Sequence, residues 1–558
     1  MNRLAVLLFS VLQFNFVKSN QLHELMTDDE IQSIFQTDRD SVPEYETVPI
    51  LHSMNKKNIK YPEVFFHAFG DDISLYLWPA EGLLFGKHTP VYTVQSDKWS
   101  PQGVRYTEYD EYGIYYAYRD ENNNAAIIVR DGMYKKYKFD GTFNKNYVIR
   151  SLSSRIIENI ITKNASYYNQ KLFPKPHKGG SFFLTNHHVI FQMNETNVKL
   201  KNPRNIIFPD NPPASNKYMD INNKTDRKNN TKDVIYPEIL LILDYDTFKS
   251  FGSDISETLV YLAAFWHGVD LRYRQLSDPQ ININLAAIII ALDKDATPYL
   301  DKFRVDDNAI NVKAMKSMGQ YLYNETRFRK SSYDIAVLMT KLQVCEWPLL
   351  PSDNSKCVPL RGISNFGSAC VWNKGTKALE AVALVHDEGF NGIATAAHEL
   401  AHILGVPHDG SASAHYIGGP GATKCKWEDG YLMSSDRFDR KAFRWSDCTI
   451  ECFKFYLQLP MARCLYNKPT INRELPAILP GTLMSLDEQC YHAGALDACY
   501  HDERACVLLY CTRKNATDQC VATAPAAEGS TCGNEKICIQ GRCINKRQWR
   551  TFSRNLMD

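Results

Sequence analysis

The stretch TAAHELAHILGVPHDG, residues 395–410, decides the fold prediction for this chain. Its first part contains good helix formers and no glycine or proline before Gly405, so the composition predicts a helix that includes His402. Residues four positions apart lie on one face of a helix, which allows the imidazoles of His398 and His402 to reach a single ion. Glu399, directly after the first of these histidines, then faces a water at the metal rather than the metal itself.

The residues after the predicted helix supply a third candidate ligand. Gly405 has access to backbone angles that other residues avoid, so it can end the helix and return His408 to the same ion. Three protein ligands leave one coordination position for water, as in catalytic zinc sites. Zinc would acidify this water and polarise a carbonyl, while Glu399 takes the proton as general base and passes it to a leaving amine. Surface histidines on an unrelated helix are the alternative interpretation.

The full pattern resembles the extended zinc signature of the metzincin proteases. A second element of that family, a methionine-containing turn beneath the metal, is matched by GYLMS at residues 430–434. By resemblance, Met433 underlies the zinc without binding it. Asp409 after the third histidine is similar to the adamalysin or reprolysin branch, as are YDIAVLMT at 333–340 and GSAC at 367–370.

The resemblance to the reprolysin branch implies a substrate site and a second metal. The stretch leading to Cys370 would be an edge strand that pairs with extended peptide substrate through backbone hydrogen bonds. Many members of the branch hold a structural calcium ion opposite the active site. Oxygen ligands suit this hard ion, although a single carboxylate is more often a surface charge. The matching positions are Glu238, Asp334, the carbonyl of Cys464 and the side chain of Asn467.

Length and composition describe ordinary globular, multi-domain material. The 558 residues exceed one usual core and suggest three or four folded units. A formal charge of +1 provides no bulk field that would attract nucleic acid or a membrane surface. The basic start and the apolar run at 4–12 predict a signal peptide over residues 1–19. Because no later stretch has about 20 uncharged apolar residues, we expect a secreted, extracellular protein without a membrane span.

The cysteines divide the chain into two differently stabilised halves. All 15 lie between Cys345 and Cys543. Together with the signal peptide, this clustering predicts disulfides, and the odd count leaves at least one thiol unpaired or intermolecular. Six Asn-x-Ser/Thr sequons are candidate glycosylation sites, although chance also explains each of them. They begin at Asn164, Asn194, Asn223, Asn229, Asn324 and Asn515.

The segment before the zinc-binding region alternates short apolar runs with polar turns. Runs such as SLYLW at 74–78 and YVIR at 147–150 predict a β-rich unit. It ends in a polar stretch at 211–232 that is typical of an exposed linker, where KTDRK at 224–228 is either a processing site or a solvated charge run. By resemblance, residues 20–228 are a pro-region, and without cysteine it cannot hold the zinc through a thiolate.

The composition then changes to an α/β pattern and finally to a cysteine-rich one. ILLIL at 239–243 and NLAAIIIAL at 284–292 predict buried strands, and residues 256–274 have helical apolar spacing. Eight cysteines from Cys490 onward, without a long periodic segment, predict a small module that depends on disulfides. Its motifs, LPG at 479–481, DEQC at 487–490 and GRC at 541–543, are similar to the disintegrin-like module of ADAMTS proteases.

These observations combine into one prediction. We expect an α/β metzincin catalytic domain at 229–467, with a twisted mixed β-sheet and a zinc-binding active-site helix. It lies between the β-rich pro-region and a disulfide-rich module at 468–558. The predicted activity is that of a zinc metalloendopeptidase acting on extracellular matrix or plasma proteins, in a layout similar to arthropod salivary and venom proteases. The alternative is a secreted binding or toxin-like protein that acts through the cysteine-rich module.

Overall fold

The structure, a computed structural model, describes most of the chain. The described ranges are 19–54, 61–79, 89–157, 183–192, 234–346, 357–469 and 479–549, several of them with short gaps. The polar stretch at 211–232, nearly all of the predicted signal peptide and five of the six sequons lie outside them. The remaining sequon residue, Asn324, is exposed at the end of a helix.

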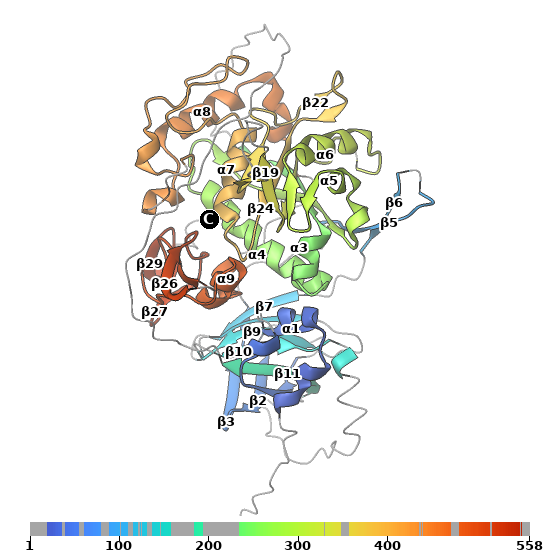
Figure 1. Cartoon of the computed structure of the whole chain (residues 1–558). Coiled ribbons are helices and arrows are strands. Elements are labelled where there is room, and N and C mark those ends of the chain that lie inside the picture. The colour runs from blue at the N-terminus through green and yellow to red at the C-terminus, as the bar shows by residue number, and fades with distance from the viewer. Residues whose placement is uncertain are drawn as a thin grey trace, which may run out of the picture.

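The N-terminal unit is a nine-stranded antiparallel sheet, which confirms the β-rich character expected of this region (Figure 1). In β2 the buried residues Val64, Phe66 and Ala68 alternate with more exposed ones, as a half-buried strand requires. Helix α1 (Asp28–Phe35) packs against the sheet through Ile31 and Phe35. The strands in spatial order are β3 (Asp71–Tyr76), β2 (Glu63–Ala68), β1 (Tyr45–His52), β11 (Phe183–Gln192), β10 (Tyr147–Ser151), β9 (Lys138–Phe143), β8 (Ala125–Arg130), β7 (Tyr115–Asp120) and β4 (Trp78–Pro79).

A seven-stranded mixed sheet forms the centre of the middle unit, which confirms the α/β prediction. The two apolar runs singled out in the sequence are its neighbouring parallel strands β13 and β15. Every residue of both strands is buried, as is typical of a parallel sheet covered on both faces. In spatial order the strands are β21 (Gly362–Ser364), β24 (Val382–His386), β18 (Ile335–Thr340), β13 (Glu238–Leu243), β15 (Asn284–Ala291), β5 (Val91–Ser96) and β6 (Val104–Glu108).

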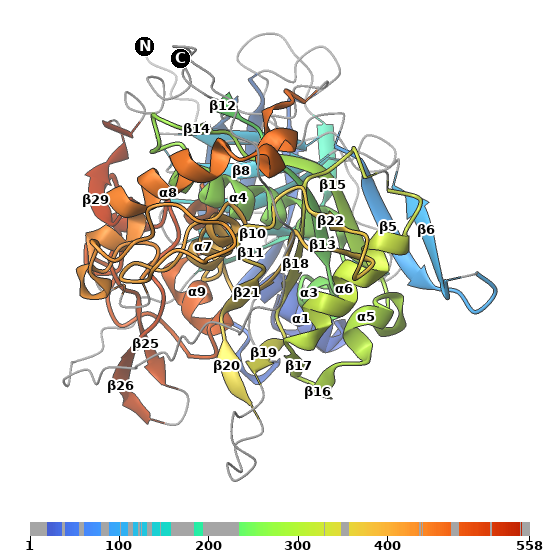
Figure 2. The same ribbon diagram turned by 90° about the horizontal axis from the view of Figure 1, so that it is seen from above.

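Helices cover both faces of this sheet. Figure 2 shows α4 (Ile255–Tyr273) and α7 (Ile393–Ile403) on one side of β13 and β18, and α6 (Lys313–Asn324) on the other. Gly268 allows α4 and α7 to pack closely, because an added Cβ would lie 2.8 Å from Ile393 Cδ1.

No helix in the described part of the chain is both long and apolar enough to span a membrane. Smaller elements are α3 (Tyr245–Ser250), α5 (Pro298–Asp301), α8 (Asp447–Leu457), β12 (Val234–Ile235), β14 (Gln280–Ile281), β16 (Arg304–Asp306), β17 (Ala309–Asn311), β19 (Gln343–Glu346), β20 (Val358–Leu360), β22 (Trp372–Asn373) and β23 (Ala378–Leu379).

Strands β5 and β6 come from the N-terminal region but belong to the sheet of the middle unit. Strand β5 pairs in parallel with β15, and β6 continues the sheet as the antiparallel partner of β5. The predicted pro-region at 20–228 therefore contributes two strands to the sheet of the predicted catalytic domain. The domain boundaries at 228 and 467 stay predictions, and the shared sheet crosses the first of them.

The C-terminal module is small and rich in disulfides, as expected. It contains α9 (Leu486–His492), the pair β25 (Tyr510–Arg513) and β26 (Ala516–Ala522), and the three-stranded sheet β27 (Thr531–Gly533), β28 (Lys536–Ile539) and β29 (Arg542–Asn545). The disulfide prediction is confirmed: fourteen cysteines form seven bonds and Cys452 is a buried free thiol. The bonds join Cys345 with Cys357, Cys370 with Cys464, Cys425 with Cys448, Cys490 with Cys511, Cys499 with Cys520, Cys506 with Cys538, and Cys532 with Cys543.

Candidate metal centre

The start of helix α7 is held by a buried carboxylate that the sequence did not reveal. Asp387 accepts a hydrogen bond from the Gly392 N–H at 2.8 Å, which satisfies a backbone donor at the helix start. Its other oxygen accepts from the Tyr261 hydroxyl of α4, and that hydroxyl accepts from the Phe390 N–H at 2.7 Å. Burial raises the pKa of Asp387 to about 6. This network ties the turn before α7 to the neighbouring helix.

The end of α7 is formed by the glycine expected from the sequence. Gly405 has φ +79°, in the left-handed region. Its N–H donates to the His402 carbonyl at 2.9 Å, and the Val406 N–H donates to the Ala401 carbonyl at 3.0 Å. These two bonds are the pattern that closes many helices with glycine in this position. The chain therefore reverses within three residues and returns toward the helix at His408.

The three predicted histidines converge at one point. The Nε2 atom of His408 lies 3.0 Å from Nε2 of His398 and 3.1 Å from Nε2 of His402. Each of the two imidazole rings on α7 also has a partner at its other nitrogen. Nδ1 of His398 lies 2.8 Å from the Leu432 carbonyl, and Nδ1 of His402 lies 2.7 Å from the Val406 carbonyl. A carbonyl only accepts, so each Nδ1 carries the hydrogen and each of these two Nε2 atoms presents a lone pair.

This arrangement fits a bound cation. His408 can offer at most one hydrogen from Nε2, so it cannot satisfy both facing lone pairs, whereas one Zn²⁺ accepts all three nitrogens. Burial, followed by the neighbouring His402 ring, lowers the pKa of His398 well below its usual value. Burial and His408 lower the pKa of His402 to about 3. Both rings are therefore neutral at ordinary pH, which is the form that binds a metal.

The carboxylate of Glu399 lies under the edge strand β21. The Ser364 hydroxyl donates to Glu399 Oε2 at 2.7 Å and lies 3.1 Å from the Glu399 carbonyl. Two residues earlier, a Cβ added to Gly362 would lie 2.8 Å from Glu399 Cγ and 2.9 Å from Oε1. Sequence reasoning missed both residues. A glycine and a serine on one face of a three-residue strand carry no pattern that points to a carboxylate 35 residues later.

The predicted methionine turn lies next to the histidines. The carbonyl that fixes His398 belongs to Leu432, and the following residue, Met433, is fully buried. Its carbonyl accepts from the Asp409 N–H at 3.1 Å. The Asp409 carboxylate, whose pKa burial raises to about 6, accepts from the Ser446 hydroxyl at 2.6 Å, at the start of α8. The turn thus contacts the segments that carry the first and third histidines.

The four residues predicted for calcium also lie together, where Glu238 begins β13 and Asp334 directly precedes β18. Asp334 Oδ2 accepts from the Glu238 N–H at 3.0 Å, and the Asn467 side-chain amide donates to Glu238 Oε2 at 2.8 Å. Asp334 and the disulfide sulfur of Cys464 fall within one group of potential ligand atoms. Burial, and then the Glu238 charge, raise the pKa of Asp334 to about 7. A divalent cation would stabilise these two carboxylates in their ionised form.

Comparison with known proteins places the three histidines inside a matched family region. The reprolysin-like profile of metallopeptidase family M12B matches residues 259–409, and the ADAMTS cysteine-rich domain 2 profile matches residues 480–544. The Bombyx mori protein named "A disintegrin and metalloproteinase with thrombospondin motifs like" is 35% identical over 560 residues, covering 93% of this chain and 77% of that protein. Venom metalloproteinase 3 of Eulophus pennicornis is 23% identical, covering 79% of this chain and 94% of that protein. The match to "A disintegrin and metalloproteinase with thrombospondin motifs 15" of Mus musculus is 27% identical and spans 30% of that protein.

Proposed function

Because the chain belongs to the ADAMTS-like reprolysin metalloproteases, we propose that it is a secreted zinc endopeptidase that hydrolyses internal peptide bonds of extracellular proteins. The observation that carries this proposal is the convergence of the Nε2 atoms of His398, His402 and His408, with Glu399 directly after the first of them on the same helix. Three histidine nitrogens leave a coordination position open, whereas a structural zinc site normally closes with four protein ligands.

In this proposal His398, His402 and His408 hold the zinc through Nε2. When bound, zinc supplies Lewis acidity that polarises the scissile carbonyl and acidifies a water molecule. Glu399 takes a proton from that water and delivers it to the departing amine, a role worth about a hundredfold to ten-thousandfold in rate. The Ser364 hydroxyl holds the Glu399 carboxylate in one orientation, because it donates to Oε2 while the helix fixes the backbone.

Strand β21 is the proposed docking edge for substrate. It pairs with β24 on one side and ends the seven-stranded sheet on the other. It also contacts α7, the helix that carries Glu399. A substrate in extended conformation would add to this edge through backbone hydrogen bonds, largely independently of its sequence. By resemblance to the family, extracellular matrix or plasma proteins are the proposed substrates.

A structural calcium ion is part of the proposal. Glu238 and Asp334 would supply carboxylate oxygens, with the Cys464 carbonyl and the Asn467 side chain as further ligands. In the structure the Asn467 amide nitrogen faces Glu238, so its oxygen would have to turn toward the ion. The disulfide between Cys370 and Cys464 supports this site, since it joins the segment after β21 to the segment that carries two of the ligands.

Export and domain order complete the proposed function. The signal peptide at 1–19 would direct the chain out of the cell, and the seven disulfides are typical of an oxidising compartment. We propose residues 20–228 as the pro-region, 229–467 as the catalytic domain and 468–558 as the disulfide-rich module. The candidate processing site at 224–228 forms the end of the pro-region.

The deciding experiment compares zinc content and proteolysis in matched variants. The full chain is expressed in secreting cells and cut within residues 211–232, and its zinc is counted. Its activity on an unfolded protein is then measured with and without a chelator. Glu399→Gln should retain zinc and lose at least a hundredfold in rate. Glu451→Gln, at an exposed position of α8, is the matched control and should be fully active. A zinc-loaded protein that cuts nothing would instead support the binding or toxin-like alternative.

A further inference from the structure

The hairpin formed by β5 and β6, residues 91–108, is built into the sheet of the metalloprotease unit. Residues Val91–Val94 pair in parallel with residues 288–291 of β15. At the two ends of the paired stretch, the Ile288 N–H donates to the Pro90 carbonyl at 3.0 Å and the Leu292 N–H donates to the Val94 carbonyl at 2.8 Å. The N-terminal unit therefore supplies the strand that covers the edge of β15.

The apolar side chains of this hairpin lie in the core of the metalloprotease unit. Val91, Val94 and Val104 are at most 1% exposed and belong to the same hydrophobic cluster as Ile288 and Ile290. Most of the buried residues of the N-terminal sheet instead form two separate clusters of their own. Removal of the hairpin would therefore open the core of the middle unit rather than that of the N-terminal unit.

An aromatic contact fixes the outer strand of the hairpin. The ring of Tyr106 packs edge-on against Phe328 at 5.3 Å between centroids, and the guanidinium of Arg327 lies 4.2 Å from the centre of the same ring. Tyr92 contacts Phe328 from β5 at 5.1 Å. Such cation and edge-on ring contacts stabilise a partly buried aromatic residue beyond its burial alone.

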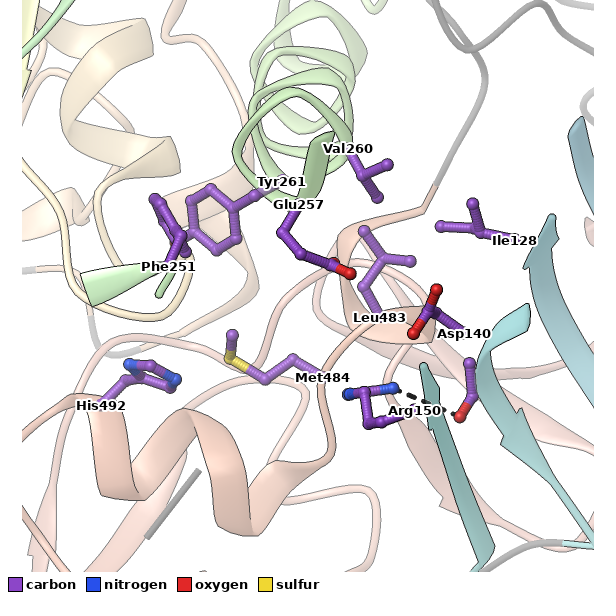
Figure 3. A pocket seen from close by; sticks show the side chains of 11 residues that line it. Ile128, Asp140, Arg150, Phe251, Glu257, Val260, Tyr261, Leu483, Met484 and His492 are labelled. Atoms are coloured by element: carbon purple, nitrogen blue, oxygen red, sulfur yellow. Dashed lines mark hydrogen bonds between the residues drawn. The ribbon is translucent and has the colours of Figure 1, made fainter. Parts of the chain in front are cut away.

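The hairpin lies far from the candidate metal centre in the order of the sheet. Strand β21, which crosses Glu399, forms one edge of the sheet, and β6 forms the other. The N-terminal unit also meets the C-terminal module, where Arg150 of β10 lies 3.6 Å from Glu488 of α9. Figure 3 shows a pocket at this junction, lined by Arg150, Glu257 of α4 and Met484 of the module. Neither the Arg150–Glu488 pair nor the lining of this pocket includes a residue of the hairpin.

We propose that the N-terminal unit is a lasting, non-covalent subunit of the processed protein, held by strand donation from the β5–β6 hairpin. After a cut between residues 193 and 233, the hairpin remains in the sheet and keeps the N-terminal fragment on the metalloprotease fragment. If the hairpin left, β15 would lose its partner at residues 288–291, three isoleucines and one alanine, and this bare apolar edge is an aggregation-prone surface. The inference does not depend on the metal chemistry, because the hairpin forms the edge of the sheet opposite β21.

The test is to cut the full chain and ask whether its parts separate. A site-specific protease sequence is placed within residues 211–232, the purified chain is cut to completion, and the product is passed through a sizing column at about 1 µM in native buffer. We expect both fragments to elute together in equal amounts and to separate only in denaturant. Separate elution in native buffer would overturn the proposal.

Variants then identify the contact that holds the fragments together. Val94→Asp places a charge in the core and should release the N-terminal fragment after cutting, whereas Arg150→Ala removes the ion pair with Glu488 and should leave co-elution intact. If Val94→Asp does not fold, Tyr106→Ala replaces it, and the cut complex should dissociate about tenfold faster than the parent. Release by Arg150→Ala, with the hairpin variants still bound, would show that the module contact and not the hairpin holds the fragment.

Discussion

A buried ion pair joins the C-terminal module to the helix behind the metal centre. Arg272 of α4 and Glu528 of the module form this pair, and their side chains are 6% and 2% exposed. The second Glu528 oxygen accepts from the Gln540 N–H at 2.9 Å. The residue after Arg272, Tyr273, donates its hydroxyl to the Ala397 carbonyl of α7 at 2.7 Å. The pair therefore connects the module to the support of the zinc helix.

The two single variants should together lower the free energy of unfolding by more than the double variant does. Glu528→Gln can keep the bond from Gln540 but leaves a guanidinium buried without a counter-charge, at a cost of about 3–5 kcal/mol. For a unit of this size that corresponds to roughly 6–20 °C in Tm. Arg272→Met should cost a similar amount. The double variant leaves no buried charge, so its loss should fall at least about 2 kcal/mol short of the sum.

Thermal unfolding followed by tryptophan fluorescence measures these differences. Trp445 is a local reporter, because its indole N–H donates to the Arg272 carbonyl at 2.8 Å. Arg504→Met in the exposed pair with Asp502, whose side chains are 49% and 48% exposed, is the matched control and should change stability by less than about 0.5 kcal/mol. Additive losses, or single variants that each cost under about 1 kcal/mol, would refute the reasoning.

Three further outcomes follow from the two proposed metal sites. Ser364→Ala should lower kcat roughly tenfold to a hundredfold at unchanged KM and zinc content, because Glu399 loses a charge-assisted hydrogen bond, and Ser364→Thr should restore it. Gly362→Ala should reduce activity with zinc retained, since the new Cβ displaces the Glu399 carboxylate; an active, zinc-loaded variant would contradict this. The folded-state pKa of Asp334, raised to about 7, means that the calcium-free protein loses stability as the pH rises from about 4 to about 7. Thermal scans in chelator should show this slope, Asp334→Asn should flatten it, and added calcium should stabilise most above pH 7.

Local patterns were sufficient for the parts of the fold that depend on nearby residues. The spacing of His398 and His402 implies one helical face, and the structure brings both rings together on α7. The unbroken apolar runs at 239–243 and 284–292 correspond to β13 and β15, because strands covered on both faces have no polar side. Helical spacing at 256–274 likewise corresponds to α4, shifted by one residue.

Contacts between distant residues were not visible in the sequence. The amino-acid sequence of β5 and β6 is typical of two ordinary strands. Nothing in that sequence identifies β15, about 200 residues later, as the pairing partner of β5. Parallel pairing between separate units depends on tertiary packing and not on a turn or a spacing. The pairing of Arg272 with Glu528 was likewise not visible in the sequence. There they are two of many charged residues, and only the structure shows that both are buried.

Two physical reasons require glycine at position 405, and only one of them can be inferred from the local sequence. The sequence predicts glycine there because the chain must turn sharply after the helix, and the observed φ of +79° agrees. The structure adds that a Cβ at this position would lie 2.3 Å from Cδ2 of Tyr456 on α8. Asparagine could adopt the left-handed backbone, but it could not occupy that space. The return of His408 to the metal centre therefore depends on packing between α7 and α8 as well as on backbone freedom.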